Sequence, residues 1–328
     1  MTAPTFGASA LQWVGVARET TYGTAVAAPT DWIPSTSPVW VPKPDVFVDD
    51  ALRGTMAPQA AQVQGLRSDS VTFSTFLYLD SSYFLIRDAL GLPDVVTGTA
   101  APYTHKTSVQ SGNNGQPAGT TVFYYDAQGK SWQMPGAQID SLKITGDVGG
   151  LVKLDVTYMG LPSTAIVPPT NTPSLVQPAP SWNSTITVAS TVMLNKSGWE
   201  WDLARSAYRV EAINGTQVPA AIGVGNCIIT GSITAIYQGS TDTDLVDLLT
   251  NGQPAMTIQI NPVGDAVHSF TFQTSVVAYD AVDITDNGGK YMQIKSTVKA
   301  LTNATDVAGG GNLSNMLVTL VSTASGAI

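Results

Sequence analysis

The sequence predicts a mainly β protein made of two tandem β-sandwich or barrel-like units, each with a short flanking α-helix. The first observation behind this prediction is an internal repeat. Residues 51–58, ALRGTMAP, reappear as residues 212–219, AINGTQVP, at an offset of 161 residues. The second observation is that most apolar segments alternate with polar residues at a period of two, which is typical of strands with one buried face. A folding unit used twice accounts for both observations.

The repeat continues downstream as a strand and then a short helix, in the same order. The strands are residues 70–73 and 232–235, and the helices are residues 80–90 and 242–249. A serine, threonine or aspartate begins each helix as a cap, and an apolar stripe follows it. In the second helix this stripe is Leu245, Leu248 and Leu249, which we expect to face the core.

A Gly-rich hairpin turn follows each helix, at residues 146–150 and 285–289. These turns are only 139 residues apart, so the first unit has extra residues between its helix and its hairpin. The stretch 97–121, rich in Gly, Pro and Asn, is the expected insertion. The expected strands of both units are 122–125, 141–145, 152–158, 270–282, 292–299 and 313–323.

These patterns divide the chain into four parts. Residues 1–40 form an N-terminal arm or strand region, and residues 41–160 form the first unit with its insertion. Residues 161–185 contain six prolines among Ser, Thr and Asn, which indicates an extended surface linker because proline cannot join interior ladders. Residues 186–328 form the second unit.

Composition excludes several classes of protein. Only 12% of residues are charged and the net charge is −9, which argues against a protein that grips nucleic-acid phosphates. No apolar run is long enough for a membrane span, and the first residues lack the pattern of a signal peptide. Cys227 is the single cysteine, so no intrachain disulfide forms and synthesis in a reducing cytoplasm fits. We expect Cys227 to be a buried strand thiol.

No motif for catalysis, phosphate binding or metal binding is present, so we expect no enzyme activity and no cofactor. His105 and His268 lack neighbouring catalytic residues and are expected to be structural. Asp280, Asp283 and Asp286 cluster at one turn, but their spacing is not that of an EF-hand loop. A solvated turn is the expected interpretation.

Residues 12–25, with the core G-x-A-x-E-T-x-Y-G-T, and residues 31–34 resemble the opening of major tail tube proteins of long-tailed bacteriophages. They are most similar to those of phages of actinobacteria. Residues 244–300, followed by residues 317–320, resemble the helix, long hairpin and closing strand of the same family.

The resemblance implies β-sandwich-like tail tube units, six to a ring, whose hairpins pair edge to edge into an inner barrel. Stacked rings form a tube through which DNA passes, and tape-measure and other tail proteins are the implied partners. The expected location is the virion tail, after assembly in the host cytoplasm. Because this chain carries two units, three chains would complete a pseudo-six-fold ring; a six-chain ring with the second unit outside is the alternative.

Polar positions on the hairpins are candidates to face the lumen. They are Ser141, Lys143, Lys153, Asp155, Thr157, Gln293, Lys295 and Thr297. Trp13, Tyr22 and Trp32 are candidates for an arm that packs on a neighbouring subunit, and an ordinary edge strand with core aromatics is the other interpretation. Two rival functions stay open: a receptor-binding β-sandwich on the virion surface, and a glycan-active β-sandwich enzyme with paired carboxylates.

Overall fold

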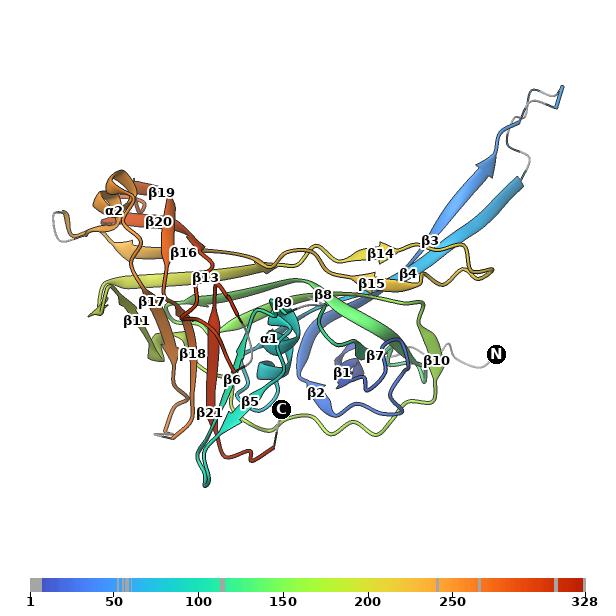
Figure 1. The fold of residues 1–328 in the computed structure, drawn as a ribbon, viewed down its shortest axis with the longest axis horizontal. Helices are drawn as coiled ribbons and strands as arrows, with labels where there is room; N and C mark the ends of the chain where they lie inside the picture. The colour runs from blue at the N-terminus through green and yellow to red at the C-terminus, as the bar shows by residue number, and fades with distance from the viewer. Residues whose placement is uncertain are drawn as a thin grey trace.

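The computed structural model describes residues 8–51, 53, 54, 56, 59, 61–112, 116–239, 242–264, 267–309 and 312–326. It confirms the mainly β fold, with 51% of residues in strands and 8% in helices. Antiparallel sheets pack in layers, and no closed barrel is formed by the described residues (Figure 1). None of the helices in this part of the chain is long and apolar enough to cross a membrane.

The elements of the first half of the chain are η1 (Ser9–Leu11), β1 (Trp13–Arg18), β2 (Asp31–Ile33), β3 (Ser35–Asp49), β4 (Ala61–Phe76), α1 (Ser82–Leu90), β5 (Val95–Thr97), β6 (Tyr103–Ser108), β7 (Thr120–Tyr125), β8 (Ser131–Asp147), β9 (Lys153–Gly160) and β10 (Thr164–Ile166). Those of the second half are η2 (Ser181–Asn183), β11 (Ser184–Val188), β12 (Thr191–Val192), β13 (Lys196–Ala204), β14 (Tyr208–Val210), β15 (Ala221–Gly223), β16 (Ile228–Ile236), α2 (Asp244–Thr250), β17 (Met256–Ile260), β18 (Ser269–Thr274), β19 (Val277–Asp286), β20 (Met292–Ala300) and β21 (Leu317–Ser322).

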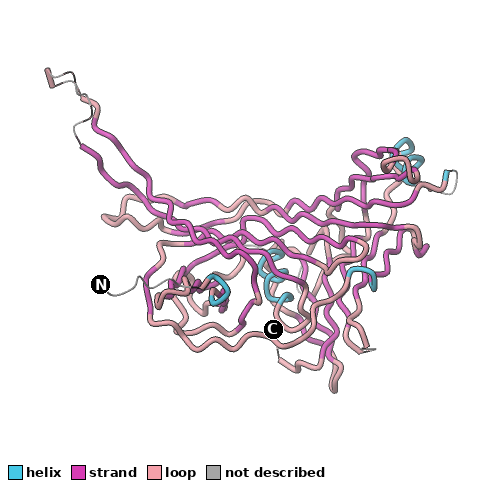
Figure 2. Tube along the Cα trace, turned by 180° about the vertical axis from the view of Figure 1, so that it is seen from behind, coloured by secondary structure: helices cyan, strands magenta, loops and turns pink. Residues whose placement is uncertain are grey.

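Eight antiparallel strands form the main sheet in the order β3-β4-β9-β8-β13-β16-β20-β19 (Figure 2). Its first four and last four strands are arranged alike. In each group, the two strands that precede the helix pair with one another, and a later hairpin adds to them through its second strand. Residues 141–147 of β8 pair with residues 198–204 of β13, and this contact, the internal seam, joins the two groups edge to edge.

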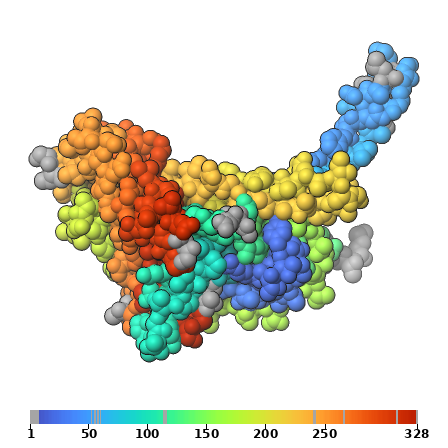
Figure 3. Space-filling view, in the orientation of Figure 1, coloured from blue at the N-terminus to red at the C-terminus, as the bar shows by residue number. Residues whose placement is uncertain are grey.

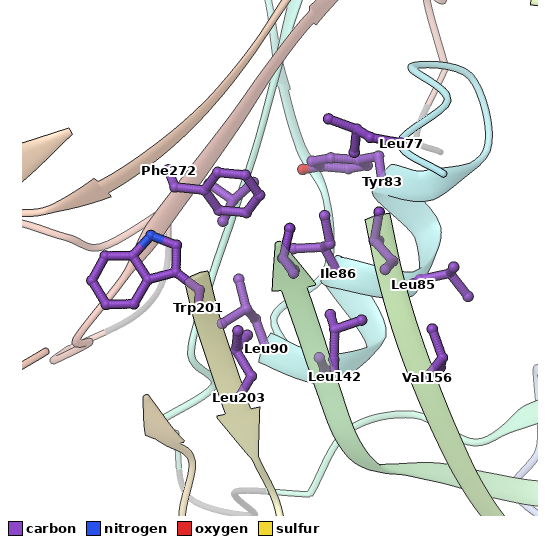
Figure 4. Close-up of a cluster of buried hydrophobic side chains, with 14 of the residues drawn as sticks. Leu77, Tyr83, Leu85, Ile86, Leu90, Leu142, Val156, Trp201, Leu203 and Phe272 are labelled. Atoms are coloured by element: carbon purple, nitrogen blue, oxygen red, sulfur yellow. The ribbon is translucent and has the colours of Figure 1, made fainter. Parts of the chain in front are cut away.

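A second sheet, β12-β11-β17-β18-β21-β6-β5, packs against the main sheet and contains strands from both halves of the chain. Helix α1 lies between these layers, and all nine of its residues are buried. Figure 4 shows its side chains meeting those of β8, β13 and β18 in the core. Tyr83 of α1 contacts the Phe270 ring of β18 edge-on, with ring centroids 6.1 Å apart.

Two expected strands differ in the structure. The expected strand 270–282 is two strands, β18 and β19, which belong to different sheets. The chain breaks at Ser275 because its backbone N–H and its hydroxyl both donate to the Asp306 carboxylate, at 2.5 and 2.6 Å. The closing strand begins at Leu317 rather than at residue 313.

The first unit carries a layer that the second unit lacks among the described residues. The first half of β8 leaves the main sheet and pairs with β7 and β10, and β7 continues the layer through β1 and β2. The expected insertion 97–121 includes β6 and the chain leading to β7, and residues 113–115 lie outside the described residues.

Both copies of the repeated motif lie at hairpin tips. Residues 51–58 connect β3 to β4 at the end of a hairpin that projects far from the body of the molecule (Figures 1 and 3). Residues 212–219 connect β14 to β15. Leu52, Thr55, Ala57 and Pro58 of the first copy lie outside the described residues.

Candidate assembly surface

The eight residues expected to line a lumen share one face of the main sheet. They alternate along β8, β9 and β20 with core residues such as Leu142, Ile144 and Leu154, which are fully buried. Strand pairing places Ser141 opposite Thr157 and Lys143 opposite Asp155. We call this surface the polar face. It contains Ser141, Lys143, Lys153, Asp155, Thr157, Gln293, Lys295 and Thr297, together with Glu200, Asp202, Thr230, Ser232 and Thr234 from β13 and β16.

Sequence reasoning missed the contribution of β13. The signal was present, because Trp199, Trp201 and Leu203 alternate with Glu200 and Asp202 at a period of two. In the structure these three apolar side chains are buried in the core, and the two carboxylates lie on the polar face.

Carboxylates neutralise lysines across the polar face. Lys143 Nζ lies 3.0 Å from Glu200 Oε1, and its hydrogen bond to Glu200 raises the pKa of Lys143. Lys153 Nζ lies 2.9 Å from Asp155 Oδ1. Burial opposes ionisation of Asp155, but hydrogen bonds from Ser74 and Lys153 outweigh it and lower the pKa of Asp155. The face therefore presents paired charges rather than a basic patch.

The two ends of the main sheet are free edges. Among the described strands, β3 pairs only with β4, and β19 pairs only with β20. An open edge strand exposes N–H and C=O groups that can pair with a strand of another chain. The chain thus offers two edges of one continuous sheet for contact with other copies.

A family model described as phage tail tube protein matches residues 10–313, which include both halves of the main sheet. The chain belongs to the phage tail tube protein family. No curated protein matches it. Membership confirms the resemblance drawn from residues 12–25, makes the chain a structural protein of the virion tail and points away from an enzymatic role.

The motif that carries the resemblance fastens the N-terminal region of this tail tube protein to its own first unit. The buried Glu19 carboxylate accepts hydrogen bonds from the Gly23 N–H, the Thr121 hydroxyl and the Gly136 N–H, at 2.7 to 2.8 Å. The Tyr22 hydroxyl accepts from the Ile222 N–H at 2.6 Å and donates to the Gly136 carbonyl at 3.1 Å.

The two candidate arm tryptophans also pack within their own chain. Trp13 and Trp32 are 4.7 Å apart between ring centroids, and they form a small buried cluster with Ala17 and Phe123. Trp13 also stacks on Tyr125. In the single chain these rings lie under the β1–β2–β7 layer rather than on an extended arm.

The titratable residues singled out in the sequence have structural partners in this tail tube protein. The buried His105 ring lies between Asp94 Oδ2, 2.7 Å from Nδ1, and the Ala324 carbonyl, 3.0 Å from Nε2. Asp280 pairs with Lys299 at 2.7 Å, and Asp286 accepts the Gly289 N–H. The described residues contain no group of three or more side chains placed to hold a metal ion.

His268 lines a pocket of about 910 Å³ together with Arg18, Asp31, Phe84 and Arg87. Burial raises the pKa of the Asp31 carboxyl, which accepts a hydrogen bond from Thr30. Burial also raises the pKa of Cys227, whose thiol lies just before β16 rather than within a strand.

Proposed function

We propose that this chain assembles with copies of itself into stacked rings whose main sheets form the wall of a DNA-conducting channel. The observation that carries this proposal is the internal seam. Inside one chain, β8 and β13 join two four-stranded groups edge to edge, while β3 and β19 stay free. Pairing of β19 with β3 of the next chain would repeat the same junction and close a ring.

The duplicated arrangement favours three chains per ring. Both groups of four strands share one strand order, and both hairpins carry a bulge at the same place: between Ile139 and Ser141 in β8, and between Tyr279 and Ala281 in β19. Units of equal shape in one sheet rotate by equal steps, so six units from three chains suit a closed heterologous ring. A six-chain ring with the second unit outside would have to break the shared sheet.

The polar face is proposed to line the channel, because the opposite face of the main sheet is covered by the core and the second sheet. DNA-binding proteins gain affinity by neutralising phosphates with Lys and Arg. Here Lys143 and Lys153 are already paired with Glu200 and Asp155, so a passing duplex finds few cations to hold it. Tape-measure and other tail proteins are the proposed further partners, and assembly in the host cytoplasm is the proposed route.

Electron microscopy of the purified protein, with native mass spectrometry of isolated rings, tests this proposal. We expect rings or tubes with a central channel of duplex width and three chains per ring. Six chains per ring would contradict the pseudo-six-fold arrangement. Failure to assemble even when seeded with tail tips, combined with binding to host-surface glycans, would favour a receptor-binding module. Glycan cleavage would favour an enzyme.

A further inference from the structure

The internal seam provides a template for the contact between chains. Within it, Lys143 of β8 lies directly opposite Asp202 of β13, with both side chains on the polar face. Each of these residues has an equivalent on a free edge of the same chain. The strand bulges fix which residues are equivalent, because each bulge marks one position in both groups.

The first equivalence concerns β8 and β19. In β8 the bulge lies between Ile139 and Ser141, and in β19 it lies between Tyr279 and Ala281. Counting two residues onward from each bulge places Asp283 at the position of Lys143. The pairing agrees, because Lys143 lies opposite Asp155 of β9 and Asp283 lies opposite Lys295 of β20.

The second equivalence concerns β13 and β3. The register shift ends at Gly198 in β13, opposite Thr234, and at Val39 in β3, opposite Thr72. Four residues onward from each lie Asp202 in β13 and Lys43 in β3. The two free edges therefore carry the charge pair of the internal seam with its signs exchanged.

We propose, building on the ring described above, that Asp283 of one chain lies opposite Lys43 of the next chain and that this pair sets the register of their contact. Both side chains are exposed, and neither forms an ion pair with another residue in the described part of the chain. Oppositely charged residues directly across an antiparallel pair stabilise it, and like charges destabilise it.

The β3 edge needs such a pair because it is poor in hydrogen-bond donors. A proline within a paired strand occupies a position whose missing N–H points away from its neighbour. Pro42 and Pro44 are paired with β4, so their missing donors face the free edge. The corresponding β13 positions, Trp201 and Leu203, are ordinary donors in the internal seam. Backbone hydrogen bonds alone thus hold the register of the β3 edge less firmly.

The neighbours of Lys43 also disfavour other registers. A slip of two residues keeps every side chain on its own face, so it is the slip that burial does not prevent. In one direction this slip would place Asp283 opposite Val41, without a charge partner. In the other direction it would place Asp283 opposite Asp45, a like charge that already pairs with Arg209 at 2.9 Å.

Charge exchange tests the pair. We expect Lys43→Asp and Asp283→Lys each to reduce the yield of sedimentable tubes by about tenfold, because like charges then meet at every chain contact. The double variant Lys43→Asp/Asp283→Lys should recover most of the yield. Lys130→Asp, in the exposed β7–β8 turn, makes the same change of net charge and should assemble as the native chain does. Circular dichroism checks that every variant is folded.

The outcomes separate this proposal from the ring itself. Native chains that form no tubes would contradict the ring. Native chains that form tubes, with a double variant that stays as poor as the single variants, would overturn the charge pair. Equal loss with Lys130→Asp would overturn it also, as an effect of net charge. In a Lys43→Cys/Asp283→Cys/Cys227→Ala variant, oxidation should link neighbouring chains, and absence of linked chains in intact tubes would contradict the register.

Discussion

Asp88 shows how much the core of this protein demands from a single residue. Its carboxylate is buried beneath α1 and accepts hydrogen bonds from the Thr120 hydroxyl at 2.5 Å and the Tyr158 hydroxyl at 3.2 Å. Burial raises the pKa of Asp88 above its ordinary value of 3.8, and the charge of neighbouring Arg87 opposes that shift. Folding therefore favours the protonated form of this carboxyl.

The raised pKa gives a pH dependence that can be measured against Asp88→Asn. A group whose pKa is raised on folding contributes stability below its unfolded pKa and loses it as pH rises through its folded pKa. We expect the free energy of unfolding of the native chain, minus that of Asp88→Asn, to fall with rising pH across this window. Urea titrations at a series of pH values measure the difference. A difference that stays constant with pH would show that Asp88 does not titrate in this way.

The N-terminal motif marks the limit of what the sequence predicts at this scale. The spacing of Glu19, Tyr22 and Gly23 carried the family resemblance, and the comparison confirmed it. The role of Glu19 could not be predicted, because two of its three donors, Thr121 and Gly136, lie more than a hundred residues away in the chain. Only the fold brings them to one carboxylate.

At the scale of elements, the two helices differ although the repeat relates them. The sequence placed both helices close to their observed bounds, but the expectation that Leu245 and Leu249 face the core was wrong. They are 38% and 77% exposed, whereas every residue of α1 is buried. Amphipathic spacing predicts an apolar stripe without saying which chain covers it. Helix α1 is covered by β18 of the second half, and α2 lies beside β19, at the free edge.

The position of α2 predicts that the next chain covers it. We expect Leu249→Ser to leave the stability of the isolated chain within about 0.5 kcal/mol, since this side chain is already exposed. The same change should reduce tube yield, because it removes apolar area from the contact between chains. Thermal unfolding and sedimentation measure the two effects. Leu175→Ser, at a leucine 94% exposed in the linker, is the matched control and should assemble normally. Normal assembly of Leu249→Ser would place α2 outside the contact.

At the scale of the whole molecule, the sequence predicted the repeat but not how its two halves join. Nothing in the local pattern of β8 and β13 shows that they pair, because their partners were expected within separate units. The structure shows one main sheet shared by both halves, so the chain already contains one junction of the proposed ring. Low charge fits this arrangement, since the long β3–β4 hairpin exposes Val46, Phe47 and Val63 for contact with other chains.

The halves are equal in the main sheet and unequal outside it, which predicts the symmetry of the assembled tube. The β1–β2–β7 layer and the long β3–β4 hairpin occur once per chain in the described structure, whereas the four-stranded group occurs twice. In cryo-electron microscopy, we expect the inner wall to approach six-fold symmetry and the outer profile to show three protrusions per ring. Class averages viewed down the tube axis, processed without imposed symmetry, measure both. Six equal outer protrusions would mean six chains per ring, each placing its second unit away from the channel wall.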